Sequence, residues 1–251
     1  MYQEGIEIVP QKKGFLHWIL HLIYPPKCVL CGAFLAEEEA VLCPQCAANL
    51  PRTNPNSGLQ FGEAFTLCLS PLHYQGMLRR SFQRYKFKGQ WHYSRIYSRW
   101  MIESLATWQP QWNLDLVTWV PLHPMRLRKR GYDQTKLLAQ PVARYLGLPL
   151  IRTLRKQKNI TAQSHLTTVS QRWENVKGSF QLLPGVEVEG RRILLIDDLI
   201  TTGATLEQAA SVLMEAGAEA VYCLTLACGA QRNQDSIELS AEAEADRQSW
   251  R

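Results

Sequence analysis

The segment that most constrains how this 251-residue chain can fold is Ile193–Ile196 together with the residues after it. Four consecutive aliphatic residues predict a short strand that is buried on both faces of a sheet. Two adjacent carboxylates, Asp197 and Asp198, follow directly, and the sequence Thr201-Thr-Gly-Ala-Thr205 then leads into a predicted helix. We therefore expect the carboxylates at the carboxyl end of the strand, the edge at which open α/β sheets bind ligands.

The loop after the carboxylates has the composition of a phosphate-binding loop. Small hydroxyl residues and a glycine let a phosphate approach the free N–H groups of a helix N-terminus. The predicted phosphate-binding residues are Thr201, Thr202, Gly203, Ala204 and Thr205. Because carboxylates repel phosphate, we expect Asp197 and Asp198 to accept hydrogen bonds from sugar hydroxyls, so that the whole site would hold a phosphorylated ribose. The alternative is an acidic pair that only caps the helix. The sequence Gly-x-x-x-x-Gly-Lys-Ser/Thr is absent, which excludes a kinase-type phosphate loop.

The segments around this site alternate between strand and helix patterns. Continuous apolar strands that alternate with helices predict an α/β fold with a parallel sheet covered on both faces. The predicted strands are 65–74 (one strand or a pair), 114–120, 193–196 and 220–227, and the predicted helices are 91–108, 133–145 and 204–216. Gly147 and Gly217 follow the last two helices, as is common at helix C-termini.

Four of the seven cysteines fall into two close pairs, Cys28-x-x-Cys31 and Cys43-x-x-Cys46. Two such turns can aim four thiolates at the corners of a tetrahedron, which is the geometry of a structural zinc site. Four thiolates leave no open position for a substrate, so this zinc would stabilise the fold and would not catalyse a reaction. A redox dithiol and an iron–sulfur cluster are the alternatives. Cys68, Cys223 and Cys228 lie in apolar strand contexts and are predicted core residues.

Positive charge is concentrated in residues 79–158, which hold 17 Lys/Arg against three acidic residues in a chain of net charge +6. This asymmetry favours a polyanionic partner, either nucleic acid or a phosphate-rich ligand, although a solvated basic face would give the same count. The candidate nucleic-acid residues are Arg79, Arg80, Arg84, Lys86 and Lys88. Aromatic residues are interleaved with them and could stack on bases or simply pack in the core. These rings are Phe82, Tyr85, Phe87, Trp91, Tyr93, Tyr97 and Trp100.

Composition and local patterns suggest five segments. They are a leader with a short apolar helix (1–27), a zinc ribbon (28–50), a basic aromatic connecting region (51–113), the α/β domain (114–230) and a disordered tail (231–251). An apolar content of 46% excludes an intrinsically disordered chain. The apolar stretch 15–24 is shorter than the roughly 20 residues of a membrane span, and no small-residue cleavage site follows it. We expect a soluble, cytoplasmic protein without a membrane span.

The run from Ile193 to Thr205 resembles the signature of type I phosphoribosyltransferases, which bind phosphoribosyl pyrophosphate (PRPP). This resemblance implies that Thr201–Thr205 holds the ribose 5′-phosphate and that Asp197 and Asp198, as the catalytic pair, hold the 2′- and 3′-hydroxyls. It also implies that Mg²⁺ binds between those hydroxyls and the pyrophosphate.

Further motifs resemble the ComF family of competence proteins, which pair a four-cysteine zinc ribbon with a phosphoribosyltransferase domain. They are Tyr85-Lys-Phe-Lys-Gly89, Val120-Pro-Leu-His-Pro-x-Arg-Leu-Arg-x-Arg-Gly-Tyr-Asp-Gln134, Thr161-x-Gln-Ser-x-Leu166, Arg172-x-x-Asn175 and Gly178-x-Phe180. Asp133 departs from the family, which more commonly has Asn there.

The resemblance places a pyrophosphate-binding loop at 120–124 and a flexible loop at about 156–170 that closes over the pyrophosphate. The planar guanidinium group of arginine can donate to two phosphate oxygens at once. The alternative is that these arginines are ordinary surface residues without a ligand. The further candidate ligand residues are His123, Arg126, Arg128, Arg130, Lys156 and Lys158.

Two functions are compatible with these features. The first is an enzyme that transfers phosphoribosyl from Mg²⁺-bound PRPP to an unknown acceptor, linked to DNA uptake in natural transformation. The second is a non-catalytic PRPP sensor that binds single-stranded DNA and works with competence and DNA-uptake proteins. A purely structural zinc protein would leave the phosphate loop unexplained.

Overall fold

We describe a computed structural model of the chain, in which residues 25–36, 41–54, 57–106, 112–157 and 178–229 are placed. The chain divides into two compact units, residues 1–49 and 50–251. The predicted leader and the predicted disordered tail lie outside the described residues, except for residues 25–27.

The first unit is small and contains the four paired cysteines. Lys27 and Phe34 form an isolated antiparallel bridge that closes a turn around Cys28-x-x-Cys31, and α2 (Pro44–Ala48) carries Cys46. Pro44 stands at the first helical position, where its missing N–H costs no hydrogen bond. Each cysteine pair is therefore held by its own short turn or helix start.

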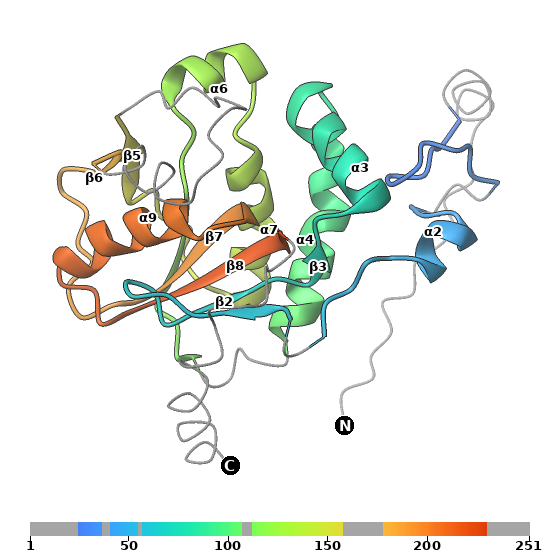
Figure 1. The fold of residues 1–251 in the computed structure, drawn as a ribbon. Coiled ribbons are helices and arrows are strands. Elements are labelled where there is room, and N and C mark those ends of the chain that lie inside the picture. Colours follow the sequence, from blue (N-terminus) through green and yellow to red (C-terminus); the bar gives the residue numbers. More distant parts are fainter. Residues whose placement is uncertain (1–24, 37–40, 55–56, 107–111, 158–177, 230–251) are drawn as a thin grey trace. The chain divides into compact units, whose positions relative to one another are not determined.

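The second unit is built on a six-stranded, mostly parallel sheet of order β1-β2-β8-β7-β4, with β3 also pairing with β8 (Figure 1). The strands are β1 (Leu59–Gln60), β2 (Leu67–Leu69), β3 (Leu72–His73), β4 (Leu116–Trp119), β7 (Arg192–Ile200) and β8 (Ala220–Cys228). β1 is antiparallel to β2, and the other pairings are parallel. Only this edge strand departs from the predicted parallel sheet. The short strands β2 and β3 extend the sheet with residues from the region expected to be a connection.

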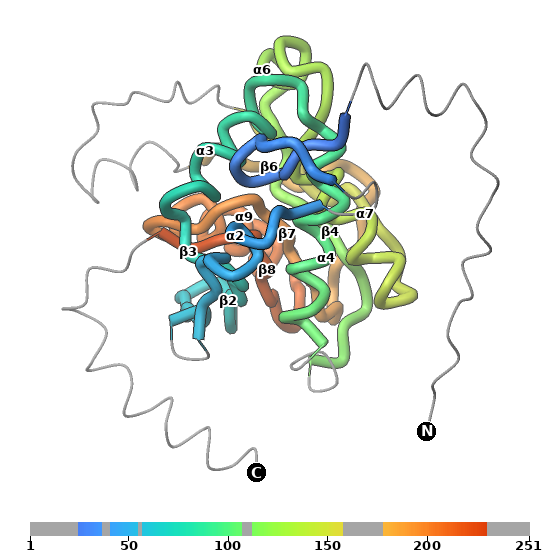
Figure 2. The backbone as a smooth tube through the Cα atoms, turned by 90° about the vertical axis from the view of Figure 1, so that its right-hand side faces the viewer, coloured from blue at the N-terminus to red at the C-terminus, as the bar shows by residue number. Residues whose placement is uncertain are grey.

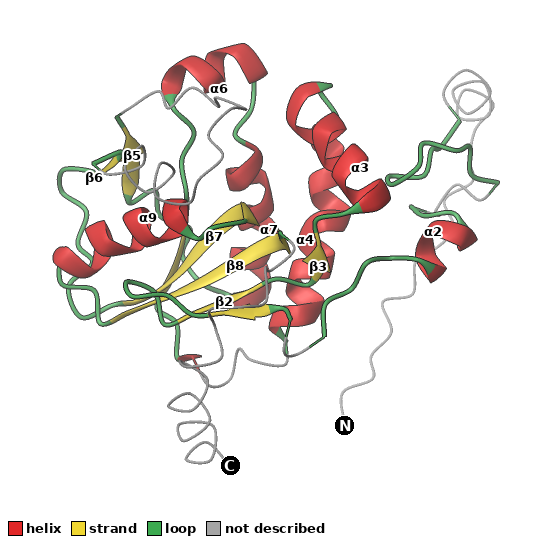
Figure 3. Cartoon of the chain, viewed as in Figure 1, coloured by secondary structure: helices red, strands yellow, loops and turns green. Residues whose placement is uncertain are grey.

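Helices cover both faces of this sheet, as Figure 3 shows. The helices of the second unit are α3 (Gly76–Phe87), the 3₁₀ turn η1 (Trp91–Tyr93), α4 (Ser94–Leu105), α6 (Pro124–Arg130), α7 (Gln134–Leu146) and α9 (Ala204–Glu215). α4 and α7 pack against each other and against the sheet, while α9 packs on β7, β8 and β6. The backbone view in Figure 2 shows the same elements turned by 90°. None of the helices in the described ranges is long and apolar enough to cross a membrane.

The core beneath α9 follows the alternation of strand side chains. Ile193 and Leu195 of β7 pack with Val221 and Cys223 of β8 and with Leu213 of α9. Cys68, Cys223 and Cys228 are buried, which confirms that they are core residues. β5 (Leu154–Lys156) and β6 (Phe180–Leu182) form a separate antiparallel pair.

Candidate functional site

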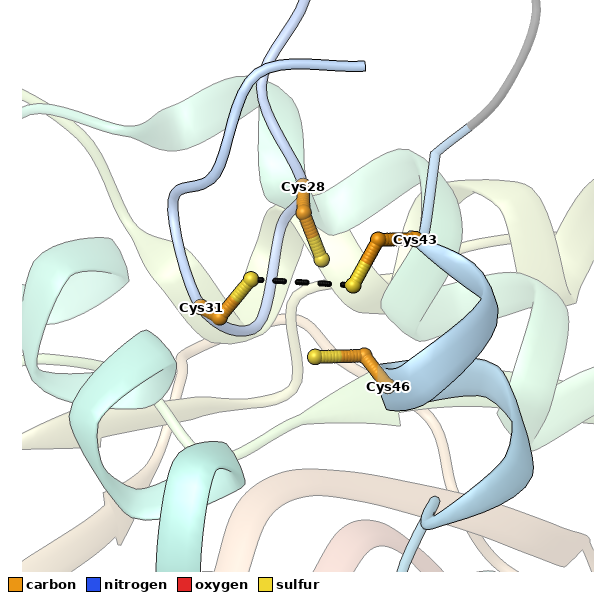
Figure 4. A group of neighbouring side chains, drawn as sticks. All are labelled: Cys28, Cys31, Cys43 and Cys46. Atoms are coloured by element: carbon orange, nitrogen blue, oxygen red, sulfur yellow. Dashed lines mark hydrogen bonds between the residues drawn. The ribbon is translucent and has the colours of Figure 1, made fainter. Parts of the chain in front are cut away.

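The four paired cysteines converge on one point, as the close-up in Figure 4 shows. Their sulfurs all lie within 4.8 Å of one another, and the Sγ atoms of Cys31 and Cys43 are 3.8 Å apart. Zn–S bonds of about 2.3 Å in a tetrahedron require neighbouring sulfurs roughly 3.8 Å apart. The donor set and its spacing therefore fit a structural zinc ion held by Cys28, Cys31, Cys43 and Cys46.

Asp197 and Asp198 lie in the last part of β7, which extends beyond the predicted strand to Ile200. Both are almost buried, with 7% and 5% of their surface exposed. The backbone N–H of Asp198 donates to Asp197 Oδ1 at 2.7 Å. Burial, together with the nearby charge of Asp198, raises the pKa of Asp197 to about 7. A proton or a cationic partner is thus needed near this pair at neutral pH.

The loop after β7 forms a small, open depression that also reaches Asp197. Residues Leu199–Leu206 line the rest of it, including all five predicted phosphate-binding residues. Gly203 adopts a φ of +76° as the N-cap of α9, a conformation that disfavours side chains. The structure thus brings Asp197 and the loop together at the start of a 12-residue helix, whereas the sequence predicted both carboxylates beside this loop.

Sequence reasoning missed the residue that fixes the first turn of this helix against another part of the chain. The buried carboxylate of Glu207 accepts the backbone N–H groups of Glu63 and Ala64, each at 2.8 Å. A Cβ on Gly62 would come within 2.0 Å of the same carboxylate, so only glycine fits there. No local sequence pattern predicts this contact, because its partners are more than 140 residues apart.

Asp198 is not among the residues that line the depression, and its carboxylate is bonded to two other elements. Lys86 of α3 places its Nζ 2.9 Å from Oδ1 and from Oδ2, and Gln134 of α7 donates through Nε2 to Oδ2 at 3.0 Å. Lys86 had been predicted to contact nucleic acid. In the structure its side chain is only 22% exposed, and its ammonium contacts Asp198.

A chain of hydrogen bonds holds these partners in place. Gln134 accepts from Arg130 through its side-chain oxygen, and its backbone carbonyl accepts the hydroxyl of Tyr85 at 2.7 Å. Tyr132 donates in turn to the backbone carbonyl of Tyr85. These bonds tie the end of α3 to the start of α7 around Asp198.

The other predicted pyrophosphate residues lie on or beside α6. His123 is the N-cap of α6, and its Nδ1 accepts the N–H of Met125 at 3.3 Å. Arg126 and Arg130 are half-buried and Arg128 is exposed. Burial lowers the pKa of Arg130, and the charge of Asp198 acts in the opposite direction. Arg130 therefore lies within the field of Asp198.

Asp133 caps α7 and accepts the indole N–H of Trp119 at 3.1 Å. Its side chain also accepts the backbone N–H groups of Thr135 and Lys136. Burial raises the pKa of this carboxyl, and hydrogen bonds from the Trp119 indole and from the backbone N–H groups of Leu122, Thr135 and Lys136 act in the opposite direction. The residue is thus satisfied as a structural cap in the described structure.

Lys156 lies in β5, where its ammonium is 4.8 Å from the centre of the Phe180 ring. Burial lowers its pKa, while the charges of Asp197 and Asp198 raise it. This places a second lysine in the field of the acidic pair. Lys158 and the rest of the predicted flexible loop, including the motifs at 161–166 and 172–175, lie outside the described residues.

The basic aromatic stretch divides into a buried and an exposed part. Five of its rings are core residues, namely Phe82, Tyr85, Tyr93, Tyr97 and Trp100. Phe87 and Trp91 are 70% and 58% exposed. Stacking on bases is therefore open only to these two of the seven rings. Arg79, Arg80 and Lys88 are exposed, and Arg84 is half-buried beside Tyr93.

Comparisons with known proteins agree with this geometry. Residues 136–244 match the phosphoribosyl transferase domain family, and residues 19–68 match the double zinc ribbon domain family. Fold and site together define a protein with a phosphoribosyltransferase fold and an N-terminal zinc ribbon.

Named relatives specify the family. The chain is 31% identical to Competence protein F of Haemophilus influenzae over 159 residues, covering 62% of this chain and 69% of that protein. It is 28% identical to the DNA utilization protein YhgH of Escherichia coli K12, covering 78% and 88%. A solved glutamine PRPP amidotransferase from B. subtilis aligns over 53% of this chain and 25% of its own, at 23% identity and a TM-score of 0.36. The chain belongs to the ComF family of competence proteins.

Proposed function

We propose that the second unit binds PRPP at the carboxyl edge of its sheet and transfers the phosphoribosyl group to an acceptor. The observation that carries this proposal is the depression in which Asp197 and the loop Thr201–Thr205 meet at the N-terminus of α9. Backbone N–H groups and hydroxyls suit a phosphate, and a carboxylate beside them suits sugar hydroxyls. A phosphorylated ribose carries both kinds of group.

The surrounding charges suit a pyrophosphate group. Lys86, Lys156 and Arg130 interact electrostatically with one or both carboxylates. Arg126 lies beside Lys156 and Arg130, so these four cations outnumber the two carboxylates. Transfer breaks the bond between C1′ and the pyrophosphate oxygen, and pyrophosphate leaves with the bonding electrons. The acceptor atom supplies the pair for the new bond and loses its proton. Cationic side chains that stabilise the leaving group suffice, and no protein nucleophile is required.

Magnesium fits this site as part of the ligand complex. Mg²⁺ is commonly held by one or two carboxylates together with substrate phosphates and water. Asp197 and Asp198 supply hard oxygen donors, while the only cluster of three or more metal-ligating residues among those described is the cysteine set. When bound, the ion would neutralise charge on the leaving pyrophosphate.

A PRPP titration with and without Mg²⁺ tests binding, and pyrophosphate release tests transfer. Ligand at 100 times its dissociation constant should raise the free energy of unfolding by about 2.7 kcal/mol. Asp197→Asn should weaken PRPP binding at least tenfold. Asp115→Asn is the matched control, because Asp115 lies beside the opposite end of β7, where it accepts the N–H of Arg192. Unchanged stability of the wild-type protein at millimolar Mg²⁺ and PRPP would contradict the proposal.

A second candidate function is the handling of single-stranded DNA in natural transformation. It rests on the relatives named for competence and DNA utilization and on the exposed cations Arg79, Arg80 and Lys88 of α3 and its C-cap. DNA binding is compatible with PRPP binding, because these side chains lie outside the depression. In this alternative, PRPP acts as a regulatory ligand without being consumed.

A further inference from the structure

Lys86 and Asp198 form an ion pair at a position where the proposed ligand would need the carboxylate. Both Asp198 oxygens lie 2.9 Å from the Lys86 ammonium, and one of them also accepts from Gln134. An ammonium is a stronger donor to a carboxylate than a sugar hydroxyl is. A ribose hydroxyl must therefore compete with Lys86 for Asp198, and it binds better once Lys86 has moved away.

The surroundings of Lys86 allow its side chain to move while its backbone stays fixed. Tyr85, the preceding residue, is bonded to α7 through its hydroxyl and to Tyr132 through its carbonyl. The Lys86 side chain retains 22% exposure, and its ammonium lies 4.5 Å from the centre of the Phe82 ring. The flexible, partly exposed lysine side chain can therefore change its rotamer while α3 stays in place.

An anionic ligand would offer the Lys86 ammonium a second binding partner besides Asp198. Lys156 acts on the same acidic pair, Arg130 lies in the field of Asp198, and Arg126 adds positive charge beside both cations. Pyrophosphate carries several negative charges and competes for an ammonium more strongly than one carboxylate does. A ribose phosphate without the pyrophosphate lacks this competitor.

We propose that Lys86 is an exchangeable counter-ion of the ligand site. It neutralises Asp198 in the free protein, moves to the pyrophosphate of bound PRPP, and thereby releases Asp198 to the ribose. This inference rests on the proposed function and names a specificity residue within it. Lys86 makes the site prefer a ribose that carries pyrophosphate over one that does not.

The test compares two ligands in the full-length, zinc-loaded protein with Mg²⁺ present. Calorimetry would give dissociation constants for PRPP and for ribose 5-phosphate in wild type, Lys86→Met and Lys86→Arg. We expect Lys86→Met to weaken PRPP binding by 10- to 100-fold. Its affinity for ribose 5-phosphate should stay equal or rise several-fold, because the competing donor is gone. Lys86→Arg should recover most of the PRPP affinity. The charge-matched control is Arg95→Met, at an exposed position of α4.

Each other outcome overturns the inference in a recognisable way. An equal loss for both ligands in Lys86→Met would mean that Lys86 only orders Asp198. Unchanged PRPP binding would mean that Lys86 never contacts the pyrophosphate. If the wild-type protein binds neither ligand, the proposed function fails as well. Thermal unfolding of Lys86→Met within a few degrees of wild type shows that the variant is folded, and Lys86→Arg decides the question if it is not.

Discussion

Lys86 and Asp198 are 112 positions apart in the sequence, yet the lysine ammonium contacts both oxygens of the carboxylate at 2.9 Å. The contact links α3, which precedes the phosphoribosyltransferase match, to the acidic pair inside it. Residues ahead of that match therefore complete the candidate site. The basic region thus contributes a specific contact to the site, in addition to its positive charge.

The raised pKa of Asp197 predicts a pH-dependent stability. The unfolded chain has this carboxyl near its ordinary pKa, while burial holds the folded value at about 7. Between roughly pH 4 and 7 the folded state therefore binds more protons than the unfolded state, and this residue's effect makes stability fall as pH rises. Asp197→Asn removes the effect. We expect the free energy of unfolding of the variant, relative to that of wild type, to increase by roughly 1–3 kcal/mol as the pH is raised from 5 to 8.

Urea unfolding at the two pH values, followed by tryptophan fluorescence, measures this difference. Other titrating groups are common to both proteins and cancel in the comparison. Parallel stability profiles would show that the Asp197 pKa is not raised.

Glu207 should stabilise the start of α9 through its two buried backbone contacts. Glu207→Gln keeps one acceptor but turns an amide NH₂ toward a backbone N–H. Leaving a buried donor unsatisfied costs about 1–3 kcal/mol, and we expect a loss of that size in the free energy of unfolding. Glu215→Gln, at an exposed position of the same helix, should change stability by less than about 0.5 kcal/mol. Equal effects of the two substitutions would contradict the structural role.

The cysteine cluster predicts one zinc ion per chain, measurable by elemental analysis of purified protein. Cys46→Ser removes a thiolate ligand and should lower the zinc content well below one per chain. Cys223→Ala, in the core of the second unit, should retain the metal. Retention of a full zinc equivalent by Cys46→Ser would argue against a four-cysteine site.

Binding of single-stranded DNA, if it uses the exposed cations of α3, should depend on salt. The logarithm of the affinity should fall with the logarithm of the salt concentration by about 0.7 for each phosphate contacted. Arg79→Gln/Arg80→Gln should therefore reduce the slope by about 1.4, as measured by fluorescence anisotropy. Arg152→Gln, an exposed position outside α3, is the control. A slope near zero in the wild-type protein would remove DNA binding as a function of this surface.

The sequence alone determined the features that depend on neighbouring residues. The cysteine spacing predicted the cluster, and the run from Ile193 to Thr205 predicted a buried strand, an acidic pair and a helix start. These are local patterns, because chain geometry over a few residues decides which side chains can converge. The predicted strand ended four residues too early, since Asp197, Leu199 and Ile200 still pair with β8.

Only the tertiary structure decided which basic and aromatic side chains are exposed and which are buried or bonded to other parts of the chain. Spacing placed Phe82, Tyr85 and Tyr97 among charged residues, but packing buries all three rings. Lys86 and Glu207 acquire their partners across more than 100 residues, where α3 meets β7 and the 62–65 turn meets α9. Such contacts arise from long-range packing, and the helix and strand periodicity of the sequence does not predict them. The local sequence thus determined the chemistry of the site, while its counter-ion and its anchoring came from the assembled fold.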